Sequence, residues 1–341
     1  MKTEQERWVD AHTLSVSGMG WTEATQPYTR LPNRAMTRVP ESVWSLSRHA
    51  AGVYVSFKTR ATVLSVRWSL ISSALSMPHM PATGVSGLDL YHQNERRGWT
   101  FLTNLRPAGV QNESRIALPP LAARTGAFRL YLPLYNGVSS VQLMANNGQS
   151  IEALEESERP RTSIVVYGTS IAQGGCASRP GNAWPSMTGR DLNRPIVNLG
   201  FSGSGRMEPE VVDLITELDP ACFVLDCVPN MGDLQQEMFC TRIKNAAALL
   251  ISRHPNTPLL FVGQDTQNTS THISVVNKWQ QDTVASLPET RRSKVAFVRG
   301  VELLGADNEG TVDGVHPNDL GMRRQADAIT SALRRLVTKA R

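Results

Sequence analysis

The chain has 341 residues, of which 40% are hydrophobic and 19% are charged, as in an ordinary soluble globular protein. That length accommodates two domains more readily than a single core. The 35 basic and 30 acidic residues give a formal charge of +5 and form no block of like charge, so we expect no nucleic-acid partner.

The N-terminal segment MKTEQERWVDAHT is polar and lacks the apolar core of a signal peptide. No stretch reaches the ~18 apolar residues that a membrane-spanning helix needs. We therefore expect a cytoplasmic protein with no membrane partner. The cysteines show no CxxC spacing, which favours buried free thiols over a metal site or a disulfide; they are Cys176, Cys222, Cys227 and Cys240.

Residues 12 to 147 predict short strands separated by turn residues. Val53, Val55 and Phe57 alternate with other neighbours, the period-two pattern of a half-buried strand. The expected strands are 52–59, 62–71, 87–93, 99–105, 128–135 and 138–145, with Gly137 in a hairpin turn between the last two. We interpret residues 1–150 as an antiparallel β-sandwich domain of jelly-roll type.

The rhythm changes after a charged linker, residues 151–162, which contains Pro160. Beyond it, the expected strands are 163–168, 195–200, 222–227, 258–263 and 294–298. The expected helices between and after them are 182–192, 208–218, 233–252, 273–287 and 318–338. Apolar strands that alternate with helices predict a parallel sheet covered on both faces. Residues 163–341 therefore form a three-layer α/β/α domain of flavodoxin-like type, whose chemistry should gather at the carboxyl ends of its strands.

Small and polar residues follow several of these strands. Ser170 comes just after the first strand, and the second ends in NLGFSGSG, which includes Gly203. Asn230 follows the third strand, where it could cap a helix or donate to an oxyanion. Near the C-terminus, DGVHPNDLG places Asp313 three residues before His316. Each feature alone has an ordinary structural explanation, but together they form an ordered set.

This set resembles the marker residues of the SGNH (GDSL-type) hydrolases, which are Ser, Gly, Asn and His in that chain order. The matching positions are Ser170, Gly203, Asn230 and His316, with Asp313 as the acid of the triad. The GxSxG elbow of α/β-hydrolases is absent, because Ala172 stands where its second glycine would be.

Two segments depart from the superfamily pattern. The GDSL segment reads GTSI, with Thr169 in place of Asp, and the GxND segment reads VPNM, which keeps only Asn230. A two-domain subgroup with an N-terminal β-domain and a GxDLY segment accommodates both departures. The chain is similar to that subgroup in GLDLY (87–91), RLP (30–32), VWSLS (43–47) and LPLYNGV (132–138).

The resemblance implies a serine esterase without cofactor or metal. Ser170 would be the nucleophile, His316 the base and Asp313 its partner, and Ser170, Gly203 and Asn230 would form the oxyanion hole. The substrate would be a short-chain acyl ester, with acetyl favoured, of a carbohydrate or small metabolite. The remaining histidines show no metal-binding spacing; they are His12, His49, His79, His92, His254 and His272.

Other assignments stay open at this stage. Trp184 could stack on a sugar or lie in the core, and Asp89 and Tyr91 could border the pocket or serve as ordinary strand residues. The alternatives to hydrolysis are an inactive, carbohydrate-binding SGNH-like protein and an acyltransferase that uses the same site. Acyl length, the alcohol partner and oligomeric state are not determined by the sequence.

Overall fold

The computed structural model groups the chain into two compact units that are not contiguous in sequence. One unit comprises Met1–Pro32, Arg48–Pro160 and Ser178–Gly181, and the other comprises Asn33–Ser47, Arg161–Ala177 and Asn182–Arg341. The structure describes residues 7–23, 26–94, 96–119, 126–155, 158, 162–265, 271–292 and 294–337. Residues 1–6 of the N-terminal segment and Pro160 of the expected linker lie outside the described residues.

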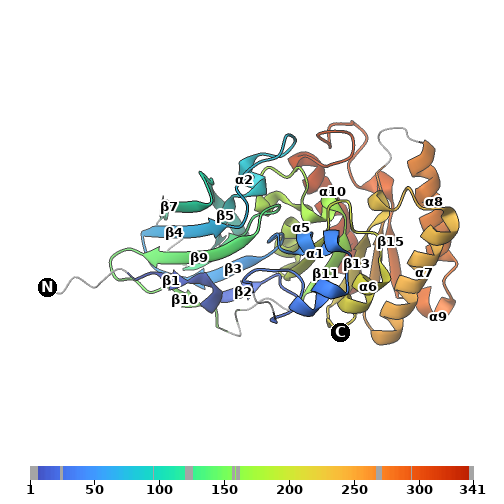
Figure 1. The fold of residues 1–341 in the computed structure, drawn as a ribbon, viewed down its shortest axis with the longest axis horizontal. Helices are drawn as coiled ribbons and strands as arrows, with labels where there is room; N and C mark the ends of the chain where they lie inside the picture. Colours follow the sequence, from blue (N-terminus) through green and yellow to red (C-terminus); the bar gives the residue numbers. More distant parts are fainter. Residues whose placement is uncertain are drawn as a thin grey trace. The chain divides into compact units, whose positions relative to one another are not determined.

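The first unit is a sandwich of two antiparallel sheets, as predicted (Figure 1). One sheet has the order β1 (Val9–Asp10), β9 (Val138–Ala145), β4 (Val63–Leu70) and β7 (Gln111–Ala117). The other has the order β10 (Glu152–Ala153), β3 (Tyr54–Lys58), β8 (Ala127–Tyr131), β5 (Leu88–Asn94) and β6 (Gly98–Leu105), with β2 (Ser15–Ser17) also paired to β3. Short helices accompany them: η1 (Ala11–Thr13) and α2 (Ala82–Val85).

Alternating apolar side chains explain why these strands pack as two layers. Val55 and Phe57 of β3 and Val66 and Trp68 of β4 are all buried in one core cluster, which contains residues of both sheets. Strand β7 has no hydrophobic pattern in the sequence, because QNESRIA is polar at most positions and its residues alternate between exposed and half-buried. Its pairing with β4 therefore comes from the backbone ladder more than from burial.

The predicted hairpin at Gly137 is wrong. Strand β8 pairs with β3 and β5, whereas β9 pairs with β1 and β4, so the chain changes sheets between them. Asn136 fixes this crossing, because its buried amide donates to the Ser72 carbonyl at 2.9 Å and to the Ser86 hydroxyl at 3.0 Å.

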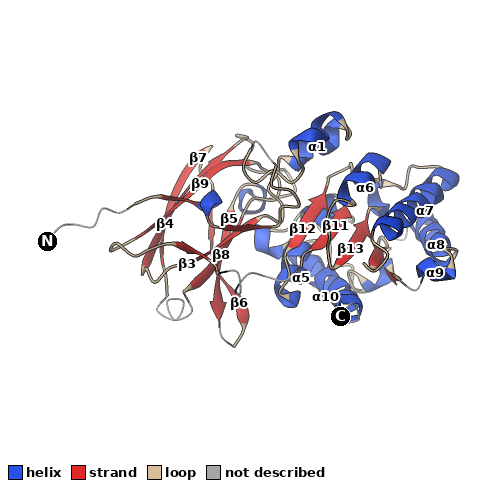
Figure 2. Ribbon diagram, turned by 90° about the horizontal axis from the view of Figure 1, so that it is seen from below, coloured by secondary structure: helices blue, strands red, loops and turns tan. Residues whose placement is uncertain are grey.

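The second unit is a five-stranded parallel sheet between two layers of helices, which confirms the predicted α/β/α class (Figure 2). The strand order is β12 (Ile196–Gly200), β11 (Ile164–Gly168), β13 (Cys222–Asp226), β14 (Leu259–Val262) and β15 (Val295–Val298). Helices α5 (Trp184–Leu192) and α10 (Asp319–Val337) cover one face. The opposite face carries α6 (Pro209–Ile215), α7 (Gln236–Arg253) and α8 (Thr271–Ala285).

Shorter helices also belong to this unit. They are η2 (Asn33–Thr37), α1 (Glu41–Ser47), α4 (Ser170–Gln173), η5 (Val228–Asn230), α9 (Glu289–Arg292) and η6 (Gly300–Glu302). Residues 33–47 belong here because Arg34 and Arg38 form ion pairs with Glu217 and Asp213 next to and within α6. The short helix η4 (Pro180–Asn182) begins in the segment Ser178–Gly181 of the first unit.

The sheet positions the candidate residues. Strand β11 is flanked by β12 and β13, and every residue of the three strands is buried. Because parallel strands end at one edge of the sheet, the loops that carry Ser170, Gly203 and Asn230 meet there. Helix α10, which follows the His316 loop, packs through Met322, Ala326, Ile329 and Leu333, a helical spacing.

The cysteines are free thiols, as predicted, and three of the four are buried. Within the described residues, no helix is both long and apolar enough to cross a membrane. The same part of the chain holds no group of three or more His, Cys, Asp or Glu side chains placed to bind a metal ion.

Candidate active site

Ser170 is the first residue of α4, two residues after β11 ends at Gly168. Thr169 is the N-cap of this helix, and its hydroxyl accepts from the Ile171 N–H at 3.3 Å. Threonine and aspartate are both favoured N-caps, so GTSI keeps the turn that GDSL would form. Ser170 is 7% exposed.

The loop before α10 brings an imidazole to this serine. Ser170 Oγ lies 2.9 Å from His316 Nε2, and His316 Nδ1 lies 2.7 Å from Asp313 Oδ2. Asp313 Oδ1 also accepts from the backbone N–H groups of His316 at 2.7 Å and Val315 at 3.0 Å. Ser170 and His316 are 146 residues apart in the sequence. The three side chains thus form one chain of hydrogen bonds.

The electrostatics of this chain favour an ionised acid. Burial by itself would raise the pKa of Asp313, but the hydrogen bonds from His316 and Val315 outweigh it and lower that pKa to about 2. An ionised carboxylate at Nδ1 holds the proton on that nitrogen and leaves Nε2 as the acceptor that faces Ser170. Such a serine hydroxyl can pass its proton to the imidazole as it attacks.

The glycine-rich loop after β12 lies against the nucleophile turn. A Cβ on Gly205 would sit 1.8 Å from the Gly168 carbonyl oxygen, so no larger residue fits this approach. Gly203 has a φ of +70°, and open space surrounds the position of its missing Cβ. Among the described residues, no acceptor pairs with the Gly203 N–H, which leaves this donor for a bound group.

Two buried amides that the sequence analysis missed hold this loop to α4. Asn198 donates to the Ala172 carbonyl at 2.8 Å and accepts from the Gly200 N–H at 2.9 Å. Gln173 accepts from the Ser202 N–H at 3.0 Å. A polar residue inside the apolar strand PIVNLG was the available signal for Asn198.

Asn230 stands at the end of η5, after β13. With its amide oxygen turned toward the loop, it accepts from the N–H groups of Ser204 and Gly205, both at 3.1 Å. The opposite orientation offers only a 3.4 Å bond from Nδ2 to the Phe201 carbonyl, so we prefer the first. The NH₂ group then points away from those donors.

A shallow hollow lies beside the candidate residues in the same unit. Ile171, Pro229 and Val315, which are the chain neighbours of Ser170, Asn230 and His316, all contribute to its wall. Asp226 also lines it, 1% exposed and with no hydrogen-bond partner for Oδ2. Burial raises the pKa of Asp226 well above its ordinary value, because the charged form loses its solvation.

Trp184 does not lie at this site. Its side chain is 0% exposed at the start of α5, and its backbone N–H donates to the Met322 sulfur at 3.4 Å. The ring therefore belongs to the packing between α5 and α10 and has no free face on which a sugar could stack.

A serine, a histidine and an aspartate in one hydrogen-bonded chain, close to a glycine-rich loop, define a serine-hydrolase type of site. Residues 161–334 match the family described as GDSL-like Lipase/Acylhydrolase family. Residues 6–151 match the family described as N-terminus of Esterase_SGNH_hydro-type. The chain belongs to the GDSL-like lipase/acylhydrolase family and is an SGNH-type ester hydrolase. No curated protein sequence matches it.

Solved structures of similar fold cover both units. A protein described as a GDSL-like lipase of Bacteroides ovatus is 30% identical over 98% of each chain, with a TM-score of 0.88. The salicylyl-acyltransferase SsfX3 of a tetracycline biosynthetic pathway is 18% identical over 98% of this chain and 97% of its own, with a TM-score of 0.75. An acetyl xylan esterase (Est2A) of Butyrivibrio proteoclasticus is 12% identical over 97% and 98%, with a TM-score of 0.58.

Proposed function

We propose that the protein is a serine esterase that hydrolyses short-chain acyl esters, acetyl esters first among them, of a carbohydrate or small metabolite. The observation that carries this proposal is the hydrogen-bonded chain from Ser170 Oγ through the His316 imidazole to Asp313, with distances of 2.9 Å and 2.7 Å.

In the first step, Ser170 Oγ attacks the ester carbonyl carbon and His316 Nε2 takes the hydroxyl proton. The carbonyl oxygen becomes an oxyanion, while Asp313 stabilises the positive charge that forms on the imidazole. Collapse of the tetrahedral intermediate breaks the bond from the carbonyl carbon to the alcohol oxygen. His316 returns the proton to the departing alcohol, and the acyl group stays on Ser170.

In the second step, water attacks the acyl-serine, again with His316 as the base, and the acid product leaves. In both steps the oxyanion receives hydrogen bonds from the backbone N–H groups of Ser170 and Gly203 and from the Asn230 amide. Two points support this assignment. The Gly203 N–H has no acceptor in the described residues, and the preferred orientation of the Asn230 amide turns its oxygen toward the N–H groups of Ser204 and Gly205. Each such donor contributes about 2.7–4 kcal/mol to transition-state stabilisation.

The preference for acetyl esters rests on the family and on the fold. The acetyl xylan esterase described above shares the two-unit fold, which makes acetylated sugars the first substrates to try. A cytoplasmic enzyme would meet small acylated metabolites, and we include these in the same substrate class.

The proposal is tested by the intact mass of the protein after exposure to a serine-directed fluorophosphonate. We expect one adduct on the wild type, mapped to Ser170 and lost in both Ser170→Ala and His316→Ala. The competent enzyme is then assayed on p-nitrophenyl acetate, butyrate and octanoate and on acetylated sugars, where we expect the highest kcat/KM for acetyl esters. A folded wild type that takes no adduct would contradict the proposal and support an inactive, carbohydrate-binding protein.

Acyl transfer would use the same acyl-serine and differs only in the molecule that attacks it. The fold shared with SsfX3 makes this a useful control. The assay is therefore repeated with an added alcohol acceptor, and both the free acid and the new ester are measured. Free acid as the main product supports hydrolysis, whereas ester as the main product at millimolar acceptor would show a transferase.

A further inference from the structure

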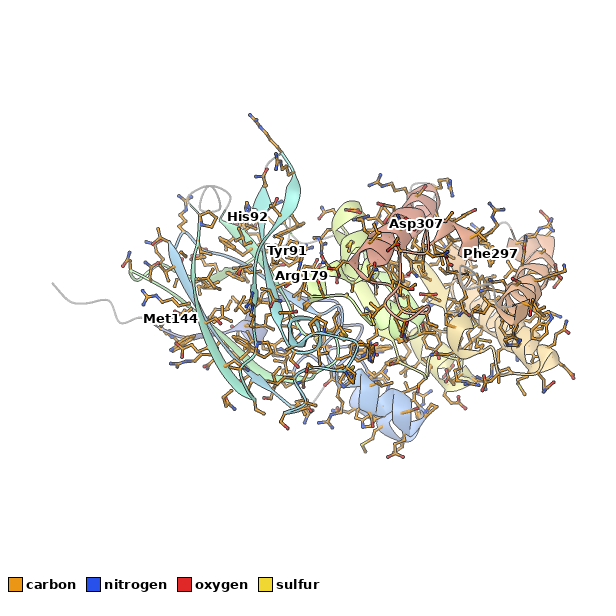
Figure 3. The ribbon with its side chains drawn as sticks, turned by 90° about the horizontal axis from the view of Figure 1, so that it is seen from above. Tyr91, His92, Met144, Arg179, Phe297 and Asp307 are labelled. Carbon is orange, nitrogen blue, oxygen red and sulfur yellow. The ribbon has the colours of Figure 1, made fainter. Side chains whose placement is uncertain are left out.

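Tyr167 and Glu208 form a buried polar pair that takes no part in the proposed steps. Tyr167 is 0% exposed and Glu208 is 7% exposed. The Tyr167 hydroxyl donates to Glu208 Oε2 and accepts from the Glu208 N–H at 3.3 Å. Phe297, labelled in Figure 3, marks β15 at one edge of the parallel sheet, and Tyr167 lies on β11, which β13 and β14 separate from that edge. Both partners belong to the unit that carries the candidate active site.

The pair fixes one end of the glycine-rich loop, residues 201–208, between β12 and α6. At the other end, the Phe201 N–H donates to the Gly168 carbonyl at 2.9 Å. Tyr167 and Gly168 are the last two residues of β11, and Ser170 follows two residues later. Both ends of the loop are therefore bonded to the strand that leads into the proposed nucleophile.

The chain just before Glu208 has an unusual backbone that needs such a contact. Met207 is 1% exposed and has a φ of +52°, a region that few residues other than glycine adopt. Strain of this kind persists only where the surrounding contacts over-determine it. Here Glu208 Oε2 accepts from the Arg206 N–H at 2.9 Å, and Arg242 Nη1 donates to the Arg206 carbonyl at 2.7 Å.

Tyr167 also contacts the segment that carries Asn230. Its carbonyl accepts from Cys227 Sγ at 3.5 Å, and the Cys227 carbonyl accepts from the Asn230 N–H at 3.1 Å. Through its hydroxyl and its carbonyl, Tyr167 is thus bonded to both loops that supply the proposed oxyanion donors Gly203 and Asn230.

We propose that Tyr167 and Glu208 are positioning residues for catalysis, whose hydrogen bonds set the place of the Gly203 N–H relative to Ser170. The inference rests on the function proposed above. The two side chains bond to each other and to the Arg206 N–H, so they act on the reaction through the backbone of the glycine-rich loop.

A purely stabilising role is the alternative explanation. Removal of either partner leaves a buried polar group unpaired, which destabilises the fold under both explanations. Loss of stability therefore does not separate the two roles, whereas the rate of chemistry in the folded protein does. Misplacement of a catalytic group by about 1 Å through a distant substitution can lower the rate ~10²-fold.

The experiment compares Tyr167→Phe, Glu208→Ala, Glu208→Asp and Glu208→Gln with the wild type in the full chain. Glu208→Gln is the conservative variant, because its amide oxygen can still accept from the Tyr167 hydroxyl and the Arg206 N–H. The matched control is His254→Ala. Glu208 caps the start of α6, whereas His254 Nε2 lies 2.7 Å from the carbonyl of Thr216, which caps its end.

Each variant is measured for its unfolding midpoint, for kcat and KM on p-nitrophenyl acetate between pH 6 and pH 8, and for the rate of fluorophosphonate labelling. All rates are taken well below the midpoint. Glu208→Asp keeps the carboxylate on a shorter side chain, so it carries the test if Glu208→Ala does not fold.

We expect Tyr167→Phe and Glu208→Ala to lower both kcat and the labelling rate by ~10–10²-fold. KM should change little, because the oxyanion forms only as the reaction proceeds. Glu208→Asp should lose part of this rate, and Glu208→Gln should recover most of it. His254→Ala should lower the midpoint while its kcat and labelling rate stay unchanged.

Two further readouts separate the oxyanion donors from the base. The pH midpoint of kcat/KM should stay at the wild-type value in every variant, because His316 keeps its bond to Asp313. The double variant of Glu208→Ala and Asn230→Ala should lose less than the product of the two single losses, since both residues hold the same loop.

Three results would overturn the inference. If the wild type is labelled and the Tyr167 and Glu208 variants are labelled at the same rate per folded molecule, the pair is structural only and the proposed esterase function stands. If the rates fall together with a shift in the pH midpoint, the pair acts on the base and not on the Gly203 donor. If the wild type itself takes no label, the proposed function fails, and the positioning role fails with it.

Discussion

Replacement of Asp313 by asparagine changes one oxygen of the proposed triad into an NH₂ group. Oδ1 can still accept from the backbone N–H groups of Val315 and His316, so the loop should keep its shape. The new NH₂ would face His316 Nδ1 at the present 2.7 Å and would favour the tautomer whose proton is on Nε2. That proton points at Ser170, which then has no base.

The expected loss in kcat/KM is ~10⁴-fold, or about 5.5 kcal/mol of transition-state stabilisation. Stability should change far less. The fall of the Asp313 pKa from 3.8 to about 2 corresponds to at most about 2.5 kcal/mol. Because the side chain is 40% exposed, solvent screening reduces this to about 1 kcal/mol.

The sign of the pH dependence gives a second check. A depressed pKa in the folded state adds stability above the pKa of the unfolded chain, and this stability is lost as the pH falls from about 4 toward 2. The difference in free energy of unfolding between wild type and Asp313→Asn should therefore be present at pH 7 and shrink over that range.

The assay is the initial rate on p-nitrophenyl acetate at pH 7 to 8, with urea unfolding of the same samples at pH 7 and pH 3. The fluorophosphonate labelling rate should fall with kcat/KM, since both depend on the same base. A loss below tenfold in folded Asp313→Asn would refute the reasoning, because it would show that the carboxylate does not set the tautomer of His316.

Three further predictions concern other parts of the site. Asn230→Ala should fold normally by circular dichroism and lose ~10²–10³-fold in kcat, and full activity would remove Asn230 from the oxyanion hole. Gly205→Ala should lose both activity and thermal stability, because its Cβ would lie 1.8 Å from the Gly168 carbonyl oxygen. Gly203→Ala has open space around the new Cβ and should lose only about 1–2 kcal/mol of stability, from its positive φ. Asp226→Asn should be more stable than the wild type at pH 8 but not at pH 4. The reason is that a raised pKa of Asp226 makes the free energy of unfolding of the wild type fall as the pH rises above about 4. Urea unfolding is the measurement, and parallel pH profiles for the two proteins would contradict a raised pKa at Asp226.

The sequence was most informative where one local pattern recurred. Apolar runs such as IVVYG and CFVLD predicted central parallel strands, because a strand covered on both faces must be apolar throughout. The order of strands and helices then placed the ends that carry Ser170, Gly203 and Asn230 at one edge of a sheet. The short spacing between Asp313 and His316 likewise made their contact a local matter.

Local pattern failed where pairing depended on partners far along the chain. Strand β7 is too polar to give a hydrophobic signal, and the turn residues around Gly137 indicated a hairpin where the chain crosses between sheets. From the sequence, Trp184 could be either a residue that stacks on a sugar or a core residue. In the structure it is completely buried where α5 packs against α10.

The sequence by itself therefore determined the class of each unit and the residue types available at the strand ends, because periodicity and chain order are local properties. Only the tertiary structure brought Ser170 within 2.9 Å of His316 and Asp89 within 2.8 Å of Arg179, 90 residues away. It also decided that Asp226 is buried with no hydrogen-bond partner for Oδ2, and that its pKa is raised by this burial. Distances, burial and the pKa values that follow from them depend on which segments meet, and no single segment contains that information.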